Sequence, residues 1–189
     1  MSFREGIDNQ GTYYQINEVA GTTPILFIHG VGLDHSIWLP QTKFFKNSTT
    51  VIYDLIGHGL STCTLEELEF EDFSKQIDGL LQILRIQKVI VVGFSLGGLV
   101  AAHYSSTRRN HVLKVILFGT IFNRTEEQKR NSTQRFVDVK STYLNAPHQL
   151  DRWFNQEYLS SHKDVGKKIT NILDNNNHED FLKSYKLFT

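Results

Sequence analysis

The sequence predicts an α/β protein in which a mostly parallel sheet is flanked by helices. Two observations carry this prediction. Short apolar runs alternate with longer helical patterns along the first two-thirds of the chain, as in consecutive βαβ units. These runs are continuously apolar rather than alternating, which indicates strands buried on both faces. With 189 residues, of which 40% are hydrophobic, the chain is long enough for one substantial core.

Four apolar runs are predicted to be the parallel strands. They span residues 24–28, 50–54, 89–93 and 114–119. Each leads into a glycine or a glycine-bearing loop, which is typical of strand ends in this class of protein. Residues 12–19 alternate between polar and apolar side chains, so they are expected to form an antiparallel strand at the start of the sheet.

Helical periodicity fills the intervals between the strands and the whole of the last third. Apolar residues recur at helical spacing in residues 65–84, and small residues open a second helix over residues 95–108. No strand-like run follows Phe122. The sequence therefore predicts a core over residues 1–121 and a helical lid over residues 122–189. Expected lid helices span residues 126–144, 148–159, 165–173 and 178–188, with a polar break at 174–177.

Composition excludes several classes of partner. Twenty basic residues balance twenty acidic ones, so no global field would attract nucleic acid or an anionic membrane. The apolar runs are strand-sized and far below the roughly 20 residues of a membrane helix. The first residues contain no apolar signal region, which favours the cytoplasm. Cys63 is the only cysteine, so an intrachain disulfide is impossible and no cysteine-based metal site is expected.

The most informative motif is Gly93-Phe94-Ser95-Leu96-Gly97. A serine becomes a nucleophile when its hydroxyl is held exposed beside a base and beside donors for an oxyanion. Glycines on either side allow the sharp strand-to-helix turn that exposes the serine. A glycine-rich turn with an incidental serine is the alternative. The β-branched run before Gly93 and the small residues after Gly97 favour Ser95 as a nucleophile.

Two further loops follow predicted parallel strands and therefore lie at the same edge of the sheet. In the first, His29-Gly30-Val31-Gly32, the Val31 N–H can point at the same oxyanion as the Leu96 N–H. His29 is expected to be a structural hydrogen-bonding residue rather than the general base. In the second loop, residues 54–61, Asp54 and His58 are expected to hold the loop by hydrogen bonds.

In this order, and with Trp38 shortly after the first loop, the three motifs resemble the α/β-hydrolase superfamily. The resemblance implies a serine hydrolase that cleaves a small carboxylic ester or lactone through an acyl-enzyme, without a metal or organic cofactor. Within the lid, Arg152-Trp153-Phe154 and residues 177–188 are most similar to 3-oxoadipate enol-lactonases. The substrate pocket is then expected to include His29, Gly30, Trp38, Phe94 and Trp153.

The sequence departs from the pattern of this family at the catalytic acid and the catalytic base. The resemblance places them after strands that follow the lid, and neither strand is found before Thr189. Gly119-Thr120 fills an alternative acid position, and His103 and His178 are interpreted as ordinary polar residues. One hypothesis is a serine hydrolase whose Asp and His are missing from these residues, which alone show little or no turnover. The other is a noncatalytic binding or interaction module that associates through an exposed core edge, for example as a dimer.

Overall fold

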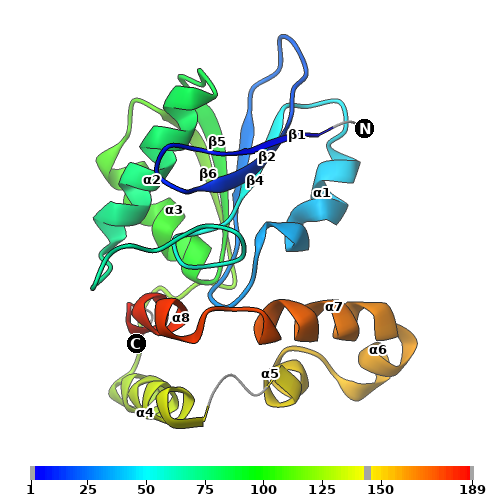
Figure 1. The fold of residues 1–189 in the computed structure, drawn as a ribbon, viewed down its shortest axis with the longest axis vertical. Helices are drawn as coiled ribbons and strands as arrows, with labels where there is room; N and C mark the ends of the chain where they lie inside the picture. The colour runs from blue at the N-terminus through cyan, green and yellow to red at the C-terminus, as the bar shows by residue number, and fades with distance from the viewer. Residues whose placement is uncertain (1–2, 143–145, 188–189) are drawn as a thin grey trace.

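The computed structural model describes residues 3–142 and 146–187 and contains a six-stranded sheet with the order β1-β2-β4-β3-β5-β6 (Figure 1). β3, β4, β5 and β6 pair in parallel, whereas β1 and β2 form an antiparallel hairpin whose second strand pairs with β4. The predicted mostly parallel sheet is confirmed. The strands are β1 (Arg4–Ile7), β2 (Tyr13–Asn17), β3 (Ile25–Ile28), β4 (Thr50–Tyr53), β5 (Val89–Phe94) and β6 (Val112–Phe118).

Helices cover the two faces of the sheet unequally (Figure 1). α2 (Phe70–Ile83) and α3 (Leu96–Thr107) lie on one face, and the short helices η1 (His35–Trp38) and α1 (Leu39–Phe44) lie on the other. The apolar stripe of α2 is fully buried against the sheet and includes Phe73, Ile77 and Leu80. The main core therefore lies between the sheet and the α2–α3 layer.

The observed start of α2 corrects the predicted helix over residues 65–84. The helix begins only at Phe70, because Glu69 is extended and forms a capping box with Asp72. The N–H of Asp72 donates to the Glu69 carbonyl at 3.1 Å, and the Asp72 carboxylate accepts from the N–H of Glu69 at 2.9 Å. Residues 65–69 therefore belong to the preceding loop.

Five further helices form a layer across the carboxyl end of the sheet (Figure 1). Ideal Cβ atoms at Gly32 and Gly57, in the loops after β3 and β4, would lie within 3.3 Å of Leu173 and 2.8 Å of Asp180 in this layer. The predicted helix over residues 148–159 is two helices, because Asn155 is extended and caps the second. The helices are α4 (Glu126–Thr142), α5 (Ala146–Trp153), α6 (Gln156–Ser161), α7 (Lys163–Asp174) and α8 (His178–Lys186).

β6 corrects the prediction that all four parallel strands are buried on both faces. Its residues from Leu113 to Phe118 are exposed, and the five apolar side chains among them are 41–50% accessible. In contrast, Leu26 and Ile28 on β3 are fully buried. The difference arises because β6 forms the edge of the sheet and pairs only with β5.

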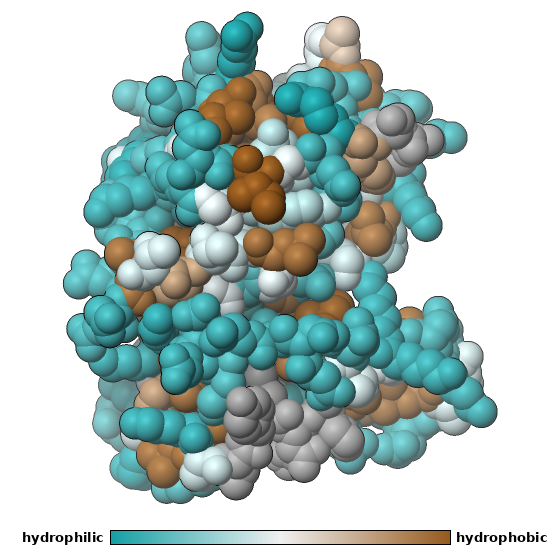
Figure 2. All heavy atoms as spheres, in the orientation of Figure 1, coloured by the Kyte–Doolittle hydropathy of each residue, from teal (hydrophilic) through white to brown (hydrophobic). Residues whose placement is uncertain are grey.

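The face shown in Figure 2 is mostly hydrophilic. Hydrophobic residues form small separate patches on it, both in the upper part and in the lower, helical part. Among the described helices, none combines the length and the apolar character that a membrane span requires.

Candidate active site

Ser95 lies at a sharp turn between β5 and α3, where its backbone has φ 55° and ψ −118°. Within residues 3–142 and 146–187, Arg85 is the only other non-glycine residue with positive φ. The Ser95 N–H donates to the Phe118 carbonyl at 2.9 Å, and the Thr120 hydroxyl donates to the Ser95 carbonyl at 2.9 Å. Neighbouring chain segments thus hold Ser95 in a conformation that L-residues rarely adopt.

The glycines around Ser95 are required by close backbone contacts. A Cβ atom on Gly93 would collide with the Gly97 carbonyl, and one on Gly97 would collide with the carbonyls of Ile28 and His29. These contacts place the start of α3 directly against β3 and β5. The motif therefore has the tight strand-to-helix packing that the sequence predicts.

The loop after β3 lies next to Ser95. An ideal Cβ on Gly30 would be 3.1 Å from the Ser95 Cβ and 3.2 Å from the Phe94 ring. No backbone carbonyl of the described chain accepts a hydrogen bond from the N–H of Val31 or Leu96. These two N–H groups, one in each segment beside the serine, are therefore not used in backbone hydrogen bonds among the described residues.

His29 holds the two loops together. Its Nδ1–H donates to the Gly30 carbonyl at 2.8 Å, and its Nε2 accepts from the Leu55 N–H at 2.9 Å. The side chain is fully buried, and this burial lowers the pKa of His29 to about 4. These two bonds agree with the expected structural role of His29, whereas its side chain has no exposed surface toward the expected substrate pocket.

Asp54 holds the second loop through a partner that the sequence did not single out. Its Oδ1 accepts from the His35 N–H at 2.7 Å and from His35 Nδ1 at 2.8 Å, and its Oδ2 accepts from the Leu60 N–H at 2.9 Å. Burial opposes ionisation of both side chains. Burial is the largest single influence, but the hydrogen bond between them and the attraction of neighbouring charges together outweigh it, so the pKa of Asp54 is lowered and the pKa of His35 is raised.

His58 is a buried neutral side chain in the same loop. Its Nδ1–H donates to the Ile56 carbonyl at 3.1 Å, which agrees with the expected role in holding the loop. Its Nε2 is buried and has no hydrogen-bond partner among the residues that the structure describes. Burial lowers the pKa of His58 to about 3. The ion-pair partner of Asp54 is therefore His35 and not His58.

The histidines near the site make their hydrogen bonds elsewhere. Among the histidines whose side chains the structure describes, none hydrogen-bonds to the Ser95 hydroxyl. His103 instead shares a hydrogen bond of 3.0 Å with Ser74 on α2, and His178 is the first residue of α8. In the same part of the chain, no three His, Cys, Asp or Glu side chains are grouped as metal ligands.

The helical layer contacts the loops beside Ser95. Phe94 packs beside a buried cluster formed by Leu33, Ile169, Ile172 and Leu173. The Asn176 side chain donates to the Gly32 carbonyl at 2.8 Å, and Lys168 Nζ donates to the Ser36 carbonyl at 2.6 Å. Neither contact was predicted from the sequence, because polar residues in a helical tail do not indicate which loop they meet.

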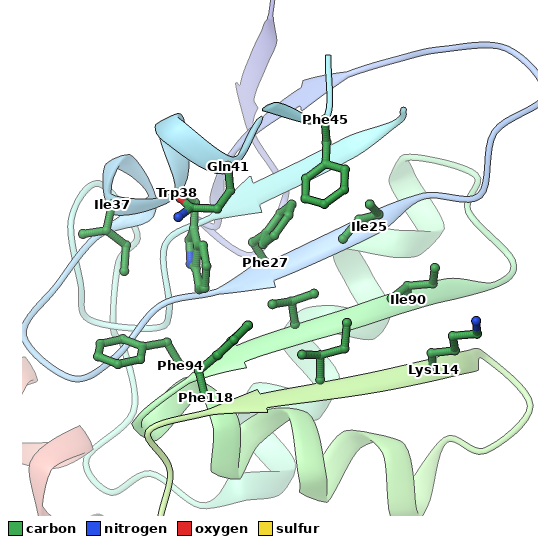
Figure 3. A pocket seen from close by; sticks show the side chains of 12 residues that line it. Ile25, Phe27, Ile37, Trp38, Gln41, Phe45, Ile90, Phe94, Lys114 and Phe118 are labelled. Atoms are coloured by element: carbon green, nitrogen blue, oxygen red, sulfur yellow. The ribbon is translucent and has the colours of Figure 1, made fainter. Parts of the chain in front are cut away.

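The remaining expected pocket residues lie in different surroundings. Trp153 ends α5 and is 41% exposed. Trp38 is buried and packs on Phe27, with ring centroids 5.0 Å apart. Trp38 and Phe94 both line a cavity of about 680 Å³, but this cavity runs along the face of the sheet and Ser95 is not among its lining residues (Figure 3). The structure thus brings Gly30, Phe94 and Ser95 together and places Trp38 in the sheet-face cavity.

Known proteins share both the sequence pattern and the fold. The (E)-2-((N-methylformamido)methylene)succinate hydrolase of Acinetobacter baylyi is 27% identical over 183 residues, which cover 96% of this chain and 68% of the relative. The 3-oxoadipate enol-lactonase 1 of the same organism is 27% identical over 169 residues, which cover 84% of this chain and 60% of the relative. The chain thus spans between 60% and 68% of the length of these two curated relatives.

Solved structures give the same result for the fold. The enol-lactonase from Burkholderia xenovorans LB400 matches with a TM-score of 0.86 at 22% identity, covering 98% of this chain and 73% of that chain. A hydrolase from Pseudomonas aeruginosa PA01 matches with a TM-score of 0.85 at 18% identity, covering 98% and 72%. The sequence profile of the alpha/beta hydrolase fold matches residues 23–166. The chain therefore belongs to the alpha/beta hydrolase family.

Proposed function

We propose that this chain carries the nucleophile of a serine hydrolase that acts on a small carboxylic ester or lactone. The observation that carries the proposal is the conformation of Ser95. A non-glycine residue at positive φ costs on the order of 1–3 kcal/mol, and such strain clusters at functional sites. The Ser95 hydroxyl has no hydrogen-bond partner among the described residues, so it is free to meet a substrate.

The reaction follows from the groups around Ser95. The Ser95 Oγ attacks the carbonyl carbon while its proton passes to a general base, and the N–H groups of Val31 and Leu96 donate to the oxyanion. The C–O bond to the leaving alcohol then breaks, and the alcohol takes up the proton. Water hydrolyses the resulting acyl-enzyme and restores the free serine. Two unused N–H donors beside the serine support this arrangement.

We assign the general base and its acid to residues outside these 189. His29 is buried and uses both ring nitrogens in bonds to backbone groups, and His35 is paired with Asp54. The chain alone is then expected to show little turnover. An oxyanion site and substrate binding without the triad still give roughly 10³ to 10⁴ over water in serine proteases.

The substrate class rests on the relatives. Their names describe a hydrolase of (E)-2-((N-methylformamido)methylene)succinate and a 3-oxoadipate enol-lactonase, and the second name supports a small ester or lactone. We assign residues 1–121 as the hydrolase core and residues 122–189 as a lid above Gly30 and Phe94, with Trp153 at its edge. The contacts of Asn176 and Lys168 with the loop after β3 support this assignment.

A fluorophosphonate probe tests the nucleophile. Attack by Ser95 forms an O–P bond and releases fluoride, which mass spectrometry of the intact chain and of its peptides detects. We expect a slow, single adduct on Ser95 that is absent from Ser95→Ala and unchanged in Ser106→Ala, an exposed serine on α3. Adducts elsewhere with Ser95 unmodified would refute the nucleophile. Complete labelling of Ser95 within minutes would instead show that a base within these residues activates the serine.

A noncatalytic binding module is the second candidate function. The exposed apolar strand β6 favours it, because such a strand is suited to association. Under this alternative, Ser95 does not react even when the chain is joined to polypeptide that supplies an Asp and a His. The same probe distinguishes the two functions, because only the hydrolase gains reactivity at Ser95.

A further inference from the structure

The turn Gly119-Thr120, which follows β6 and occupies an alternative acid position of the family, bonds directly to Ser95. The Thr120 hydroxyl donates to the Ser95 carbonyl at 2.9 Å. An ionised carboxylate at this position could only accept a hydrogen bond, whereas a threonine hydroxyl donates one. Thr120 therefore gives the Ser95 carbonyl a donor that an ionised acid would not provide.

Two glycines make this contact possible. Gly119 has φ 52°, a left-handed conformation that turns the chain at the end of β6. On α3, an ideal Cβ on Gly98 would lie 2.6 Å from the Thr120 Cβ and 2.9 Å from the Thr120 Oγ1. Gly98 thus leaves the space that the threonine side chain occupies. Two segments that are distant in the sequence are shaped around Thr120.

The Ser95 carbonyl accepts more hydrogen bonds than a helix start requires. It accepts from the Gly98 N–H at 2.9 Å and from the Leu99 N–H at 3.3 Å, as expected for the residue before a helix. The bond from Thr120 is additional and comes from a different part of the chain. The Ser95 N–H in turn donates to the Phe118 carbonyl at 2.9 Å. Residues 118–120 therefore hold both polar backbone groups of Ser95.

The bond from Thr120 reaches the oxyanion site through one peptide unit. The Ser95 carbonyl and the Leu96 N–H belong to the same planar amide. A donor on the carbonyl oxygen draws electron density from the amide nitrogen, so the Leu96 N–H becomes a stronger donor. Consecutive hydrogen bonds of this kind strengthen one another by roughly 10–30% each. The same bond restrains the peptide plane and so fixes the direction of the Leu96 N–H.

We propose that Thr120 is a positioning residue for hydrolysis at Ser95. Its hydroxyl polarises and orients the peptide between Ser95 and Leu96, which makes the Leu96 N–H a stronger and better aimed oxyanion donor. The proposal rests on the proposed function, because that function gives Leu96 its role. Loss of a whole oxyanion donor costs about 10²–10³ in rate. Weakening the donor by roughly 10–30% on the logarithmic scale corresponds to about 2- to 8-fold.

Chemical shifts test the polarisation without any reaction. Thr120→Val removes the hydroxyl and keeps the branched shape, whereas Thr120→Ser keeps the hydroxyl. A hydrogen bond to a carbonyl moves the NMR resonances of its carbon and of the attached amide nitrogen to higher ppm. We expect the Ser95 carbonyl carbon and the Leu96 nitrogen to move to lower ppm in Thr120→Val and to return in Thr120→Ser. Unchanged resonances in Thr120→Val would overturn the proposal.

The labelling rate with the fluorophosphonate probe tests the effect on the reaction. We expect Ser95 to label about 5-fold more slowly in Thr120→Val. The loss should lie in the rate at saturating probe, because the oxyanion donor acts in the transition state. Thr120→Ser should restore the rate. Thr107→Val is the matched control, since the exposed Thr107 hydroxyl donates to the His103 carbonyl at 3.0 Å at the other end of α3. Its labelling rate should equal that of the wild type.

The outcomes separate the role of Thr120 from the proposed function. A wild-type labelling rate in folded Thr120→Val, or a loss that Thr120→Ser does not restore, would overturn the role of Thr120 alone. Absence of labelling at Ser95 in every protein, the wild type included, would refute the hydrolase, while the chemical shifts still decide whether Thr120 polarises the peptide. Urea denaturation establishes that each variant is folded. If Thr120→Val fails to fold, Thr120→Ala removes the same hydroxyl with less bulk.

Discussion

The Asp54 carboxylate and His35 form a two-point contact in which one oxygen, Oδ1, accepts from both the backbone N–H and the Nδ1 of His35. The Asp54 side chain is fully buried, whereas the His35 side chain is 12% exposed. The contact joins the loop after β3 to the end of β4. It therefore connects the segment that carries Val31 to the second loop of the site, residues 54–61.

Replacing Asp54 tests the strength of this connection. Asp54→Asn keeps the shape but removes the charge and presents an N–H₂ group to a donor. We expect the free energy of unfolding to fall by about 2–4 kcal/mol, because breaking a buried ion pair leaves its partner uncompensated. Urea denaturation measures the change. Glu18, which forms an exposed ion pair with Arg4, provides the control. Glu18→Gln should lower the free energy of unfolding by less than about 1 kcal/mol. Equal losses in the two variants would contradict the prediction.

The same variant should change the titration of His35. Burial lowers the pKa of His35, but the hydrogen bond to Asp54 and the negative charges of Asp54 and Asp34 together outweigh burial and raise the pKa in the folded protein. Its stabilising contribution is therefore complete below the ordinary histidine pKa of 6.5 and is lost as the pH rises through the raised value. In Asp54→Asn, NMR titration should show the pKa of His35 below that in the wild type. An unchanged pKa would show that Asp54 does not hold the proton.

His29 and His58 should make the fold sensitive to acid. Burial lowers the pKa of His29 to about 4 and that of His58 to about 3. Because the unfolded chain binds these protons near pH 6.5, the free energy of unfolding should fall as the pH drops from 6.5 toward 4. His29→Gln can keep one donor and one acceptor, so it should reduce this slope whatever its stability at neutral pH. His111→Gln, at an exposed position, should leave the slope unchanged. Equal slopes in all three proteins would refute the assignment.

Alanine substitutions should distinguish a position that requires glycine from a position that tolerates a side chain. Gly97→Ala places a Cβ against two carbonyls of the backbone, which cannot move aside as a flexible side chain can. We expect a loss of at least about 3 kcal/mol or failure to fold. Gly166→Ala on α7 would meet only Leu159, at 3.6 Å. It should raise the free energy of unfolding by about 0.5–1 kcal/mol through higher helix propensity. Thermal denaturation of both variants checks the contrast, and a tolerated Gly97→Ala would contradict it.

The strain at Ser95 has a measurable size. Ser95→Gly and Ser95→Ala both remove the hydroxyl, but only glycine adopts φ 55° without strain. We expect Ser95→Gly to be about 1 kcal/mol more stable than Ser95→Ala, despite the greater flexibility of glycine in the unfolded chain. Arg85→Gly, at the same φ after the end of α2, offers a comparison away from the site. A less stable Ser95→Gly would indicate that the turn is not strained.

The sequence predicted the elements that are buried by their own composition. Apolar runs marked β3, β4 and β5, and a helical apolar stripe marked α2. β1 was missed because Arg4–Ile7 is a largely exposed edge strand without an apolar run. α1 was missed as well, since its six residues, Leu39–Phe44, are too few to establish a helical period. The exposure of β6 was not predicted, because an apolar run indicates which surface should be covered but not whether it is.

The candidate site was predictable where it depends on local backbone geometry. The glycines around Ser95 and the loop at Gly30 were identified because close contacts and sharp turns demand particular residues. The pairing of His35 with Asp54 was not, since it depends on how two loops 19 residues apart meet. The available signal in the sequence was that His35 comes shortly after β3 and that Asp54 directly follows β4, the neighbouring strand. The direction of the Trp38 side chain could not be predicted either, because it depends on the short helix η1, which Trp38 ends.

The hydrogen bond from Ser95 to Phe118 makes the turn at Ser95 dependent on the edge strand. Local opening requires less free energy in poorly covered elements than in a packed core. When β6 frays, Ser95 loses the acceptor of its N–H, and with it one of the contacts that maintain the left-handed backbone. The order of the turn at Ser95 therefore depends in part on the closure of β6, alongside the Thr120 hydroxyl that donates to the Ser95 carbonyl. The proposed nucleophile is thus tied to the least covered strand of the parallel sheet.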